Sequence, residues 1–233
     1  MGGDKQEIER IRKVYGKRDI ACGGRYAWYK PDVQLSKYAR FRWVSSVMFR
    51  HFGEDISNLS VLDVGCGTGV FLRELVEAGA DPNKLTGTEL LEDRLTVARR
   101  STAPGVSWVL GDLDALPSDE MFHIVSAFTV FSSILNDEFR KRLADKMWQR
   151  LLPGGVLMVF DFRFDNPANL DVRRVTKKEL CTWWPSGNSS FNTLLLAPPL
   201  LRRIAPHSST ICQAFEALCP FLRSHFIFSV KKG

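Results

Sequence analysis

The sequence predicts one α/β domain whose sheet is mostly parallel, has an antiparallel last strand and carries helices on both faces. Short apolar runs alternate with amphipathic stretches from residue 60 onward, which is the pattern of βαβ units. These runs are rich in Val, Leu and Phe, as expected of strands buried on both faces. The length of 233 residues fits a single core.

The alternation predicts the first part of the domain in detail. We expect strands at residues 60–64, 84–90, 106–110, 122–128 and 155–162. We expect helices between them at residues 70–78, 92–100 and 137–152. Pro153-Gly154-Gly155 is expected to end the last helix and to turn the chain into the fifth strand.

The alternation loosens after residue 165. A helix is expected from Thr176 to Trp184, with Thr176 as its N-cap and Glu179 completing a capping box. Two further strands are expected at residues 192–197 and 224–230. Between them lies an insertion, residues 198–220, with a helix of its own at residues 208–218.

Two helices are expected before the alternating region. Residues 4–18 form a charged, solvent-facing stretch, and Pro31 precedes a second helix that begins at about Asp32 or Gln34 and ends at His51. We therefore divide the chain into an N-terminal helical cap, residues 1–57, and a main domain, residues 58–233 with the insertion at 198–220.

Composition excludes several classes of protein. Hydrophobic residues make up 45% and charged residues 25%, which is ordinary for a globular domain. No apolar run approaches the roughly 20 residues that span a bilayer, and the charged N-terminus lacks the apolar core of a signal peptide. We expect a cytoplasmic protein that is not inserted in a membrane.

The five cysteines are widely spaced and do not cluster with the four histidines. No pair forms C-x-x-C, so neither a metal site nor a disulfide framework is predicted. The formal net charge of +6 favours anionic partners. Because this charge is spread along the chain rather than held in one run, it supports an anionic acceptor only weakly.

A glycine-rich loop joins the first strand to the first helix. It reads Asp63-Val64-Gly65-Cys66-Gly67-Thr68-Gly69. Glycines let the backbone turn tightly and approach a ligand, and the following helix N-terminus offers free N–H groups. Glu89 ends the second strand, where an acid can accept hydrogen bonds from both ribose hydroxyls of an adenosine cofactor.

A dinucleotide site shares this plan, but its fingerprint requires a small residue at position 70, where this chain has Val70. Asp63 would also repel a pyrophosphate, whereas a cofactor that carries an amino group and a sulfonium would be attracted to it. The electrostatics therefore favour an adenosine that bears an amino acid over NAD.

Four segments in order resemble the motifs of class I S-adenosylmethionine-dependent methyltransferases. They are Asp63-x-Gly65-x-Gly67-x-Gly69, Glu89, Gly111-Asp112-Leu113 and Leu151-Leu152-Pro153-Gly154-Gly155. The resemblance covers residues 58–163 and implies a Rossmann-like, doubly wound sheet that binds S-adenosylmethionine and releases S-adenosylhomocysteine.

The resemblance also implies roles for particular residues. Gly65, Cys66 and Gly67 are expected beside the methionine moiety, with Asp63 close by. Glu89, followed by Leu90, is expected at the ribose. The adenine would be contacted by Asp112 and Leu113, and Phe128 would face cofactor and acceptor.

Each of these residues also has a structural interpretation. Asp112 could be a turn residue and Leu113 a core residue, while Glu89 could cap the helix that follows it. Phe128, judged by residue type alone, is typical of packing. The order of the motifs favours the binding roles.

Methyl transfer from a sulfonium is a direct displacement, so alignment supplies much of the catalysis, and a base is needed only if the acceptor loses a proton early. Asp161 and His225 are the candidate bases. Arg163 and Tyr29 are candidate acceptor contacts, and Tyr26 could close over the cofactor with Tyr29. Structural roles for all five remain open.

The acceptor is expected to be a small polar molecule or glycan, methylated on a hydroxyl oxygen. The fourth strand reads Ser126-Ala127-Phe128-Thr129, not the (N/D)-P-P-(Y/F) of many base-amine methyltransferases. The C-terminal third is similar to methyltransferases of bacterial polysaccharide and natural-product clusters. An RNA methyltransferase is an alternative, because aromatic and basic residues interleave over residues 25–50; a protein that binds the cofactor without transferring methyl is another.

Overall fold

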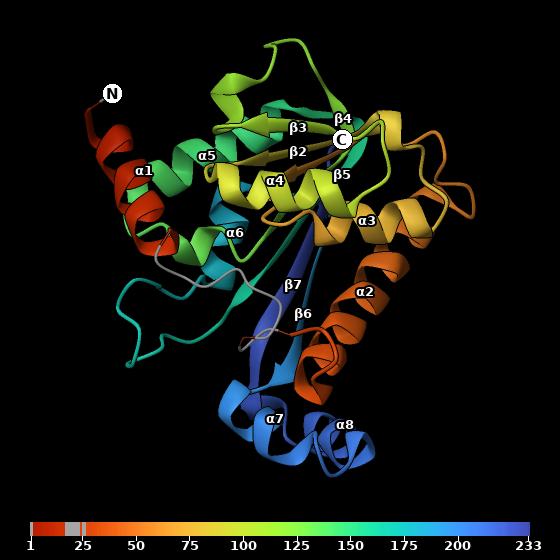
Figure 1. Ribbon diagram of the computed structural model, residues 1–233, viewed down its shortest axis with the longest axis vertical. Helices are drawn as coiled ribbons and strands as arrows, with labels where there is room; N and C mark the ends of the chain where they lie inside the picture. The colour runs from red at the N-terminus through yellow and green to blue at the C-terminus, as the bar shows by residue number, and fades with distance from the viewer. Residues whose placement is uncertain (1, 17–23, 25–26) are drawn as a thin grey trace.

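A seven-stranded sheet forms the centre of the computed structural model, which describes residues 2–16, 24 and 27–233 (Figure 1). The strand order is β3-β2-β1-β4-β5-β7-β6, and β7 is antiparallel to both neighbours. The strands are β1 (Val61–Val64), β2 (Leu85–Glu89), β3 (Ser107–Leu110), β4 (Phe122–Phe128), β5 (Leu151–Phe162), β6 (Ser189–Leu196) and β7 (Arg223–Lys231). The expected doubly wound, mostly parallel sheet with an antiparallel last strand is confirmed.

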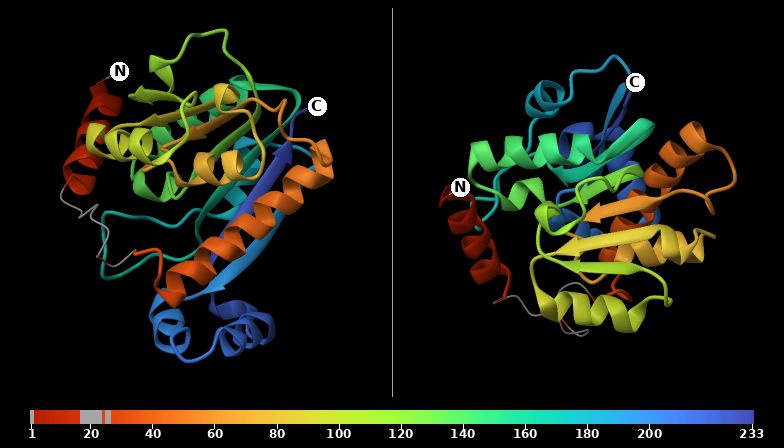
Figure 2. Two further views of the ribbon diagram at one scale, coloured as in Figure 1. Left: turned by 45° about the vertical axis from the view of Figure 1, so that its right-hand side comes forward. Right: turned by 90° about the horizontal axis from the view of Figure 1, so that it is seen from above.

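Helices cover both faces of the sheet (Figure 2). They are α1 (Gly2–Tyr15), α2 (Pro31–Phe52), α3 (Val70–Glu77), α4 (Glu92–Ser101), α5 (Asp137–Gln149), α6 (Lys177–Trp183), α7 (Pro198–Ile204) and α8 (Ser209–Leu218). Val47 of α2 and Leu72 of α3 pack into the core on one face. Leu143 of α5 and Leu180 of α6 pack into the core on the other.

The long helix α2 begins with Pro31 at its first position, where the missing N–H costs nothing. It ends at Gly53, whose φ of 80° suits glycine. Val44, Val47 and Met48 are buried against the sheet. The division of the chain after residue 57 stays a prediction, and α2 shares its core with the main domain.

The boundary between α5 and β5 was predicted wrongly. The helix ends at Gln149, not at residue 152, and Pro153-Gly154-Gly155 lies inside β5 rather than before it. The carbonyl of Arg150 accepts a hydrogen bond from the Phe122 N–H at 2.8 Å. Pairing with β4 therefore starts at Leu151, next to Phe122. Because the backbone at Leu151 pairs with β4, α5 does not continue to residue 152.

The later elements follow the prediction with one addition. Thr176 accepts from the Glu179 N–H while the Glu179 side chain accepts from the Thr176 N–H, so the capping box is present. The insertion contains two helices rather than one, because Pro198 starts α7 directly after β6. Ser208 caps the second, α8.

Short 3-10 turns connect several elements and lie at residues 82–84, 113–115, 131–133 and 220–222. Within the described residues, no helix combines the length and apolar character needed to cross a membrane. The four cysteines that the structure describes are free; Cys66 and Cys212 are buried, and Cys181 and Cys219 are half-buried.

Parallel strands end at a common edge, and this edge positions the site. The carboxyl ends of β1, β2, β4 and β5 lead into the glycine loop, the turn at Leu90, the segment at Thr129 and the segment at Arg163. The strand β7 starts at the same edge, because His225 pairs with Phe162. Residues expected in the site from distant parts of the sequence are therefore neighbours in space.

Candidate active site

The glycine loop needs glycine at each of its three positions. Gly65, Gly67 and Gly69 have φ values of 65°, 57° and 72°, which side chains rarely tolerate. A Cβ atom on Gly65 would lie 2.7 Å from Val130 Cγ2, and one on Gly69 would lie 2.5 Å from the Trp108 ring. Among the described residues, a Cβ on Gly67 would meet only Arg94 Nη1, at 3.9 Å. Within this part of the chain, the loop is thus packed at both ends and open at Gly67.

Glu89 fastens the loop to the end of β2. One carboxylate oxygen, Oε2, accepts from the Gly67 N–H at 3.0 Å. The other, Oε1, accepts from the N–H groups of Leu90 and Leu91 at 2.8 and 3.1 Å, just before α4. Both of these residues precede α4, whose N-cap is Leu91 and has no side-chain cap, so Glu89 orders the turn before the helix without capping it. Its Oε2 retains acceptor capacity beside Gly67.

Asp63 lies in β1 directly before the loop and is 3% exposed. Its Oδ1 accepts from Ser126 Oγ at 2.7 Å. Burial raises the pKa of Asp63 to about 7, although the Ser126 bond and the nearby Arg40 charge favour the carboxylate. A cationic group bound beside Asp63 would stabilise its ionised form.

Asp112 and Leu113 follow β3, where the adenine was expected. Asp112 accepts from the Asp114 N–H at 3.0 Å and caps a 3-10 turn, as its structural interpretation required. The Leu113 side chain is 2% exposed and lies in the core. The Leu113 side chain therefore does not line an open cleft, whereas Asp112 is half-buried and uses only Oδ1 in the cap.

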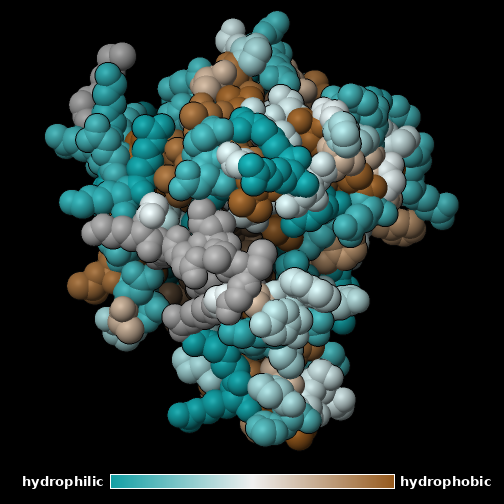
Figure 3. Space-filling model, in the orientation of Figure 1, coloured by the Kyte–Doolittle hydropathy of each residue, from teal (hydrophilic) through white to brown (hydrophobic). Residues whose placement is uncertain are grey.

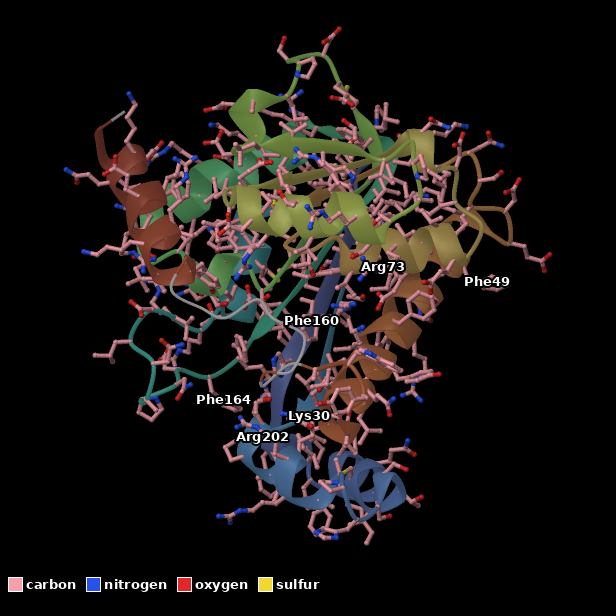
Figure 4. All side chains as sticks on the ribbon, viewed as in Figure 1. Lys30, Phe49, Arg73, Phe160, Phe164 and Arg202 are labelled. Carbon is pink, nitrogen blue, oxygen red and sulfur yellow. The ribbon has the colours of Figure 1, made fainter. Side chains whose placement is uncertain are left out.

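Aromatic rings line the strand ends beyond the glycine loop. The half-buried Phe128 contacts Phe71 and Phe160 edge-on, with ring centroids 4.8 and 6.3 Å apart. The guanidinium of Arg40 lies over the Phe128 ring at 5.5 Å. In Figure 4, Phe160 lies on the strands of the sheet, while Phe164 and Lys30 appear lower in the view, nearer α7. The rings form an apolar floor next to the loop.

Two arginines near this loop were not predicted. Arg40 of α2 is paired with Glu74 at 2.8 Å, and Arg94 of α4 lies beside Gly67. Each has a buried Nε without a partner in the described part of the chain. Buried donors are normally satisfied, so these atoms fit a ligand that carries a carboxylate. Neither arginine belongs to a local motif, because each reaches the loop from a separate helix.

Asp161, a candidate base, is fully buried at the end of β5. Its Oδ2 accepts from the Ser132 N–H at 2.9 Å and its Oδ1 from the Phe162 N–H at 2.8 Å. Burial raises the pKa of Asp161 to about 6. With no exposed surface, this carboxylate links β5 to the segment after β4 and does not reach an acceptor directly.

His225, the other candidate base, is 8% exposed. Its ring stacks on Phe160 at 5.1 Å and lies 4.3 Å from Phe162, and Nδ1 is 2.9 Å from Ser224 Oγ. Burial lowers the pKa of His225 to about 4. The imidazole is therefore neutral near pH 7, but it is a weak base that belongs to the aromatic floor.

The candidate acceptor contacts have different surroundings. Arg163 Nη1 donates to the carbonyls of Pro220 and Arg223, at 3.3 and 2.9 Å, and so ties the end of β5 to the end of the insertion. Tyr29 is 60% exposed and contacts Trp28 edge-on. Tyr26 lies outside the described residues. The roles of Arg163 and Tyr29 in acceptor binding stay predictions.

Comparison with known proteins gives a consistent picture. Residues 61–155 match the family model described as a methyltransferase domain. The chain is 25% identical over 225 residues to a ubiquinone biosynthesis O-methyltransferase of Mesorhizobium japonicum, covering 89% of this chain and 83% of the relative. A relative of the same name from Rickettsia canadensis is 20% identical over 198 residues, covering 82% of this chain and 77% of that one.

Solved structures share the fold. The plantazolicin methyltransferase BpumL, solved with S-adenosylhomocysteine, is 15% identical with a TM-score of 0.63 and covers 100% of this chain and 98% of its own. A methyltransferase from Mesorhizobium loti is 20% identical with a TM-score of 0.58, covering 85% of this chain and 100% of its own. The methyltransferase-domain match, the relatives named as O-methyltransferases and the ordered motifs show that the protein is an S-adenosylmethionine-dependent methyltransferase, and the solved structures show that it shares the class I fold.

Proposed function

We propose that this methyltransferase acts on a hydroxyl oxygen of a small acceptor whose flat face lies on the aromatic floor. The observation that carries the proposal is the half-buried ring of Phe128 at the end of β4, which is backed by the buried rings of Phe160 and His225 at the ends of β5 and β7. Relatives named as O-methyltransferases support oxygen as the methylated atom. A phenol ring or the apolar face of a sugar can lie against such rings.

The chain's own residues divide the work of binding. The Gly67 backbone and Glu89 would hold the ribose, and Asp63 would hold the amino group of the cofactor. The unpartnered Nε atoms of Arg40 and Arg94 flank this place and would attract its carboxylate. When bound, the cofactor supplies an electrophilic methyl on a sulfonium, and these residues fix its direction.

Proton removal needs no dedicated base in this arrangement. Asp161 is sealed from the cleft, and His225 is a weak base. A hydroxyl of low pKa can lose its proton to solvent as the new bond forms. A phenolic hydroxyl, which has a lower pKa than a sugar hydroxyl, is therefore the favoured acceptor. An anionic substituent on the acceptor would be attracted to the exposed cations of α7, Arg202 and Arg203.

The RNA alternative gains no support from α2, which contains most of the aromatic and basic stretch. Arg40 is paired with Glu74, and Trp43 packs against the core. Tyr38 is 76% exposed but has no described aromatic neighbour. Successive bases need successive stacking surfaces, and this helix turns its side chains in different directions.

The test is an acceptor panel that contains phenols, catechols and matched sugars, with formation of S-adenosylhomocysteine as the readout. We expect turnover of a phenolic acceptor and a product methylated on oxygen, identified by mass spectrometry. Replacing Phe128 with Leu should raise KM for the acceptor about tenfold with little change in cofactor affinity. Turnover of sugars alone would redirect the proposal to glycans, and N-methylated products would contradict it.

A further inference from the structure

The N-terminal helix α1 is fastened to the protein by a buried charge. Glu7 is the one buried residue among side chains 4–15, with 8% exposure. Apolar contact is slight, since only Ile11 of α1 packs against the main core cluster. The outer surface of α1 is hydrophilic in Figure 3. Acidic residues are rarely buried unless they are paired, so Glu7 requires a specific explanation.

The partners of Glu7 provide it. Its Oε1 accepts from the Leu135 N–H at 2.6 Å. Both carboxylate oxygens also pair with Arg10, at 2.8 and 3.0 Å. Arg10 Nη2 in turn donates to the Ser133 carbonyl at 2.5 Å. The ion pair therefore presents one acceptor and one donor to the backbone of the segment after β4.

That segment, residues 129–136, follows the strand end that carries Phe128. Its inner side is held by Asp161, which accepts from the Ser132 N–H, and by Arg140, which donates to the Ile134 carbonyl at 2.7 Å. Its outer side is held by the Glu7–Arg10 pair. The segment is thus fixed between the core and α1.

The other end of α1 contacts Arg94, the side chain that lies beside Gly67. The Tyr15 hydroxyl contacts Ser133 Oγ, and the guanidinium of Arg94 lies 5.1 Å from the centre of the Tyr15 ring. Arg94 is also the nearest side chain to the open position at Gly67. In Figure 1, α1 lies beside α5. One helix therefore contacts residues on both sides of the site.

We propose that Glu7 is a positioning residue for methyl transfer, which holds α1 against residues 129–136 and so keeps Tyr15 and Arg94 closed over the cofactor side of the cleft. The proposal rests on the proposed function, since it assumes that the cofactor lies at the glycine loop. We call the Glu7–Arg10 pair and its hydrogen bonds to Ser133 and Leu135 the clasp. The proposal predicts that breaking the clasp loosens both α1 and residues 129–136. Cofactor binding should then weaken, although Glu7 acts only through these contacts.

The experiment compares Glu7→Gln and Arg10→Gln with the matched control Glu9→Gln, which changes an exposed carboxylate on the same helix. Hydrogen exchange without any ligand is measured over residues 2–15 and 129–139, and the affinity for S-adenosylhomocysteine is measured by calorimetry. We expect exchange in both segments to rise, and affinity to fall about tenfold, in the first two variants only.

Three results would overturn the proposal. The first is wild-type exchange in both clasp variants, and the second is faster exchange with unchanged affinity, which is what a merely stabilising contact would give. The third is an equal effect of Glu9→Gln. A wild-type protein that binds no S-adenosylhomocysteine would instead contradict the proposed cofactor site, and the clasp with it, so the two failures are distinguishable.

Discussion

Two acidic residues adjoin the glycine loop and differ in their hydrogen-bond partners. Glu89 accepts three hydrogen bonds from backbone N–H groups, those of Gly67, Leu90 and Leu91. Asp63 is buried with one hydroxyl partner, and burial raises its pKa to about 7. The charge of Asp63 therefore depends on pH and on what binds beside it.

Removing the charge of Glu89 should weaken cofactor binding without unfolding the protein. We expect Glu89→Gln to reduce the affinity for S-adenosylmethionine by roughly 10- to 100-fold, the value of one charge-assisted hydrogen bond of about 1.5–3 kcal/mol. Calorimetry gives the affinity, and circular dichroism checks the fold. Glu92→Gln, at an exposed carboxylate on α4, should leave affinity unchanged; equal affinities in a folded Glu89→Gln variant would refute the ribose assignment.

Asp63 should make cofactor binding depend on pH. A bound amino group prefers the carboxylate, so below a pKa of about 7 binding must first remove a proton from Asp63. We expect affinity to fall by up to about tenfold per pH unit between pH 7 and pH 5.5 and to level off above pH 7.5. Calorimetry across this range measures it.

The Asp63→Asn variant is the control for that titration. It should bind more weakly at pH 7.5 and lose the pH dependence below pH 7. The same variant should unfold at a higher temperature at pH 8, because the folded wild type holds an ionised carboxylate in a buried site there and is most stable when Asp63 is protonated. A pH profile unchanged by Asp63→Asn would assign the titration to another group.

At the scale of elements, those with strong local signals were predictable. The capping box of α6 was predicted from residue types at fixed spacing, and a helix was predicted over residues 208–218, where α8 lies. The start of β5 was not, because it depends on a hydrogen bond from Phe122, almost thirty residues earlier. The helix α7 was also missed, although Pro198 at its first position was an available signal.

The α6 capping box offers a direct test of an element's stability. Thr176→Ala removes the side chain that accepts from the Glu179 N–H at 3.2 Å, and should lower the free energy of unfolding by about 1 kcal/mol. Urea unfolding measures the difference. Thr182→Ala, at an exposed position inside the same helix, should change stability by less than about 0.5 kcal/mol. Equal losses would show that the cap is not the cause.

At the scale of the whole molecule, the topology decides which residues share the site. The glycine loop and Glu89 were predictable because each follows a strand within one βαβ unit. Arg40, Arg94 and Glu7 were not, because each acts from a helix whose place over the sheet is set by tertiary packing. Arg163 donates to the carbonyl of Arg223 and Tyr29 is exposed, and their roles in acceptor binding stay predictions.

The central claim is that the open glycine loop binds an adenosine that carries an amino acid. Calorimetric titration of the protein with S-adenosylmethionine and, separately, with NAD tests it most directly. We predict micromolar binding of S-adenosylmethionine at pH 7.5 and no measurable heat with NAD, because Asp63 attracts an amino group and repels a pyrophosphate. Binding of NAD, or no binding of S-adenosylmethionine by folded protein, would contradict the account.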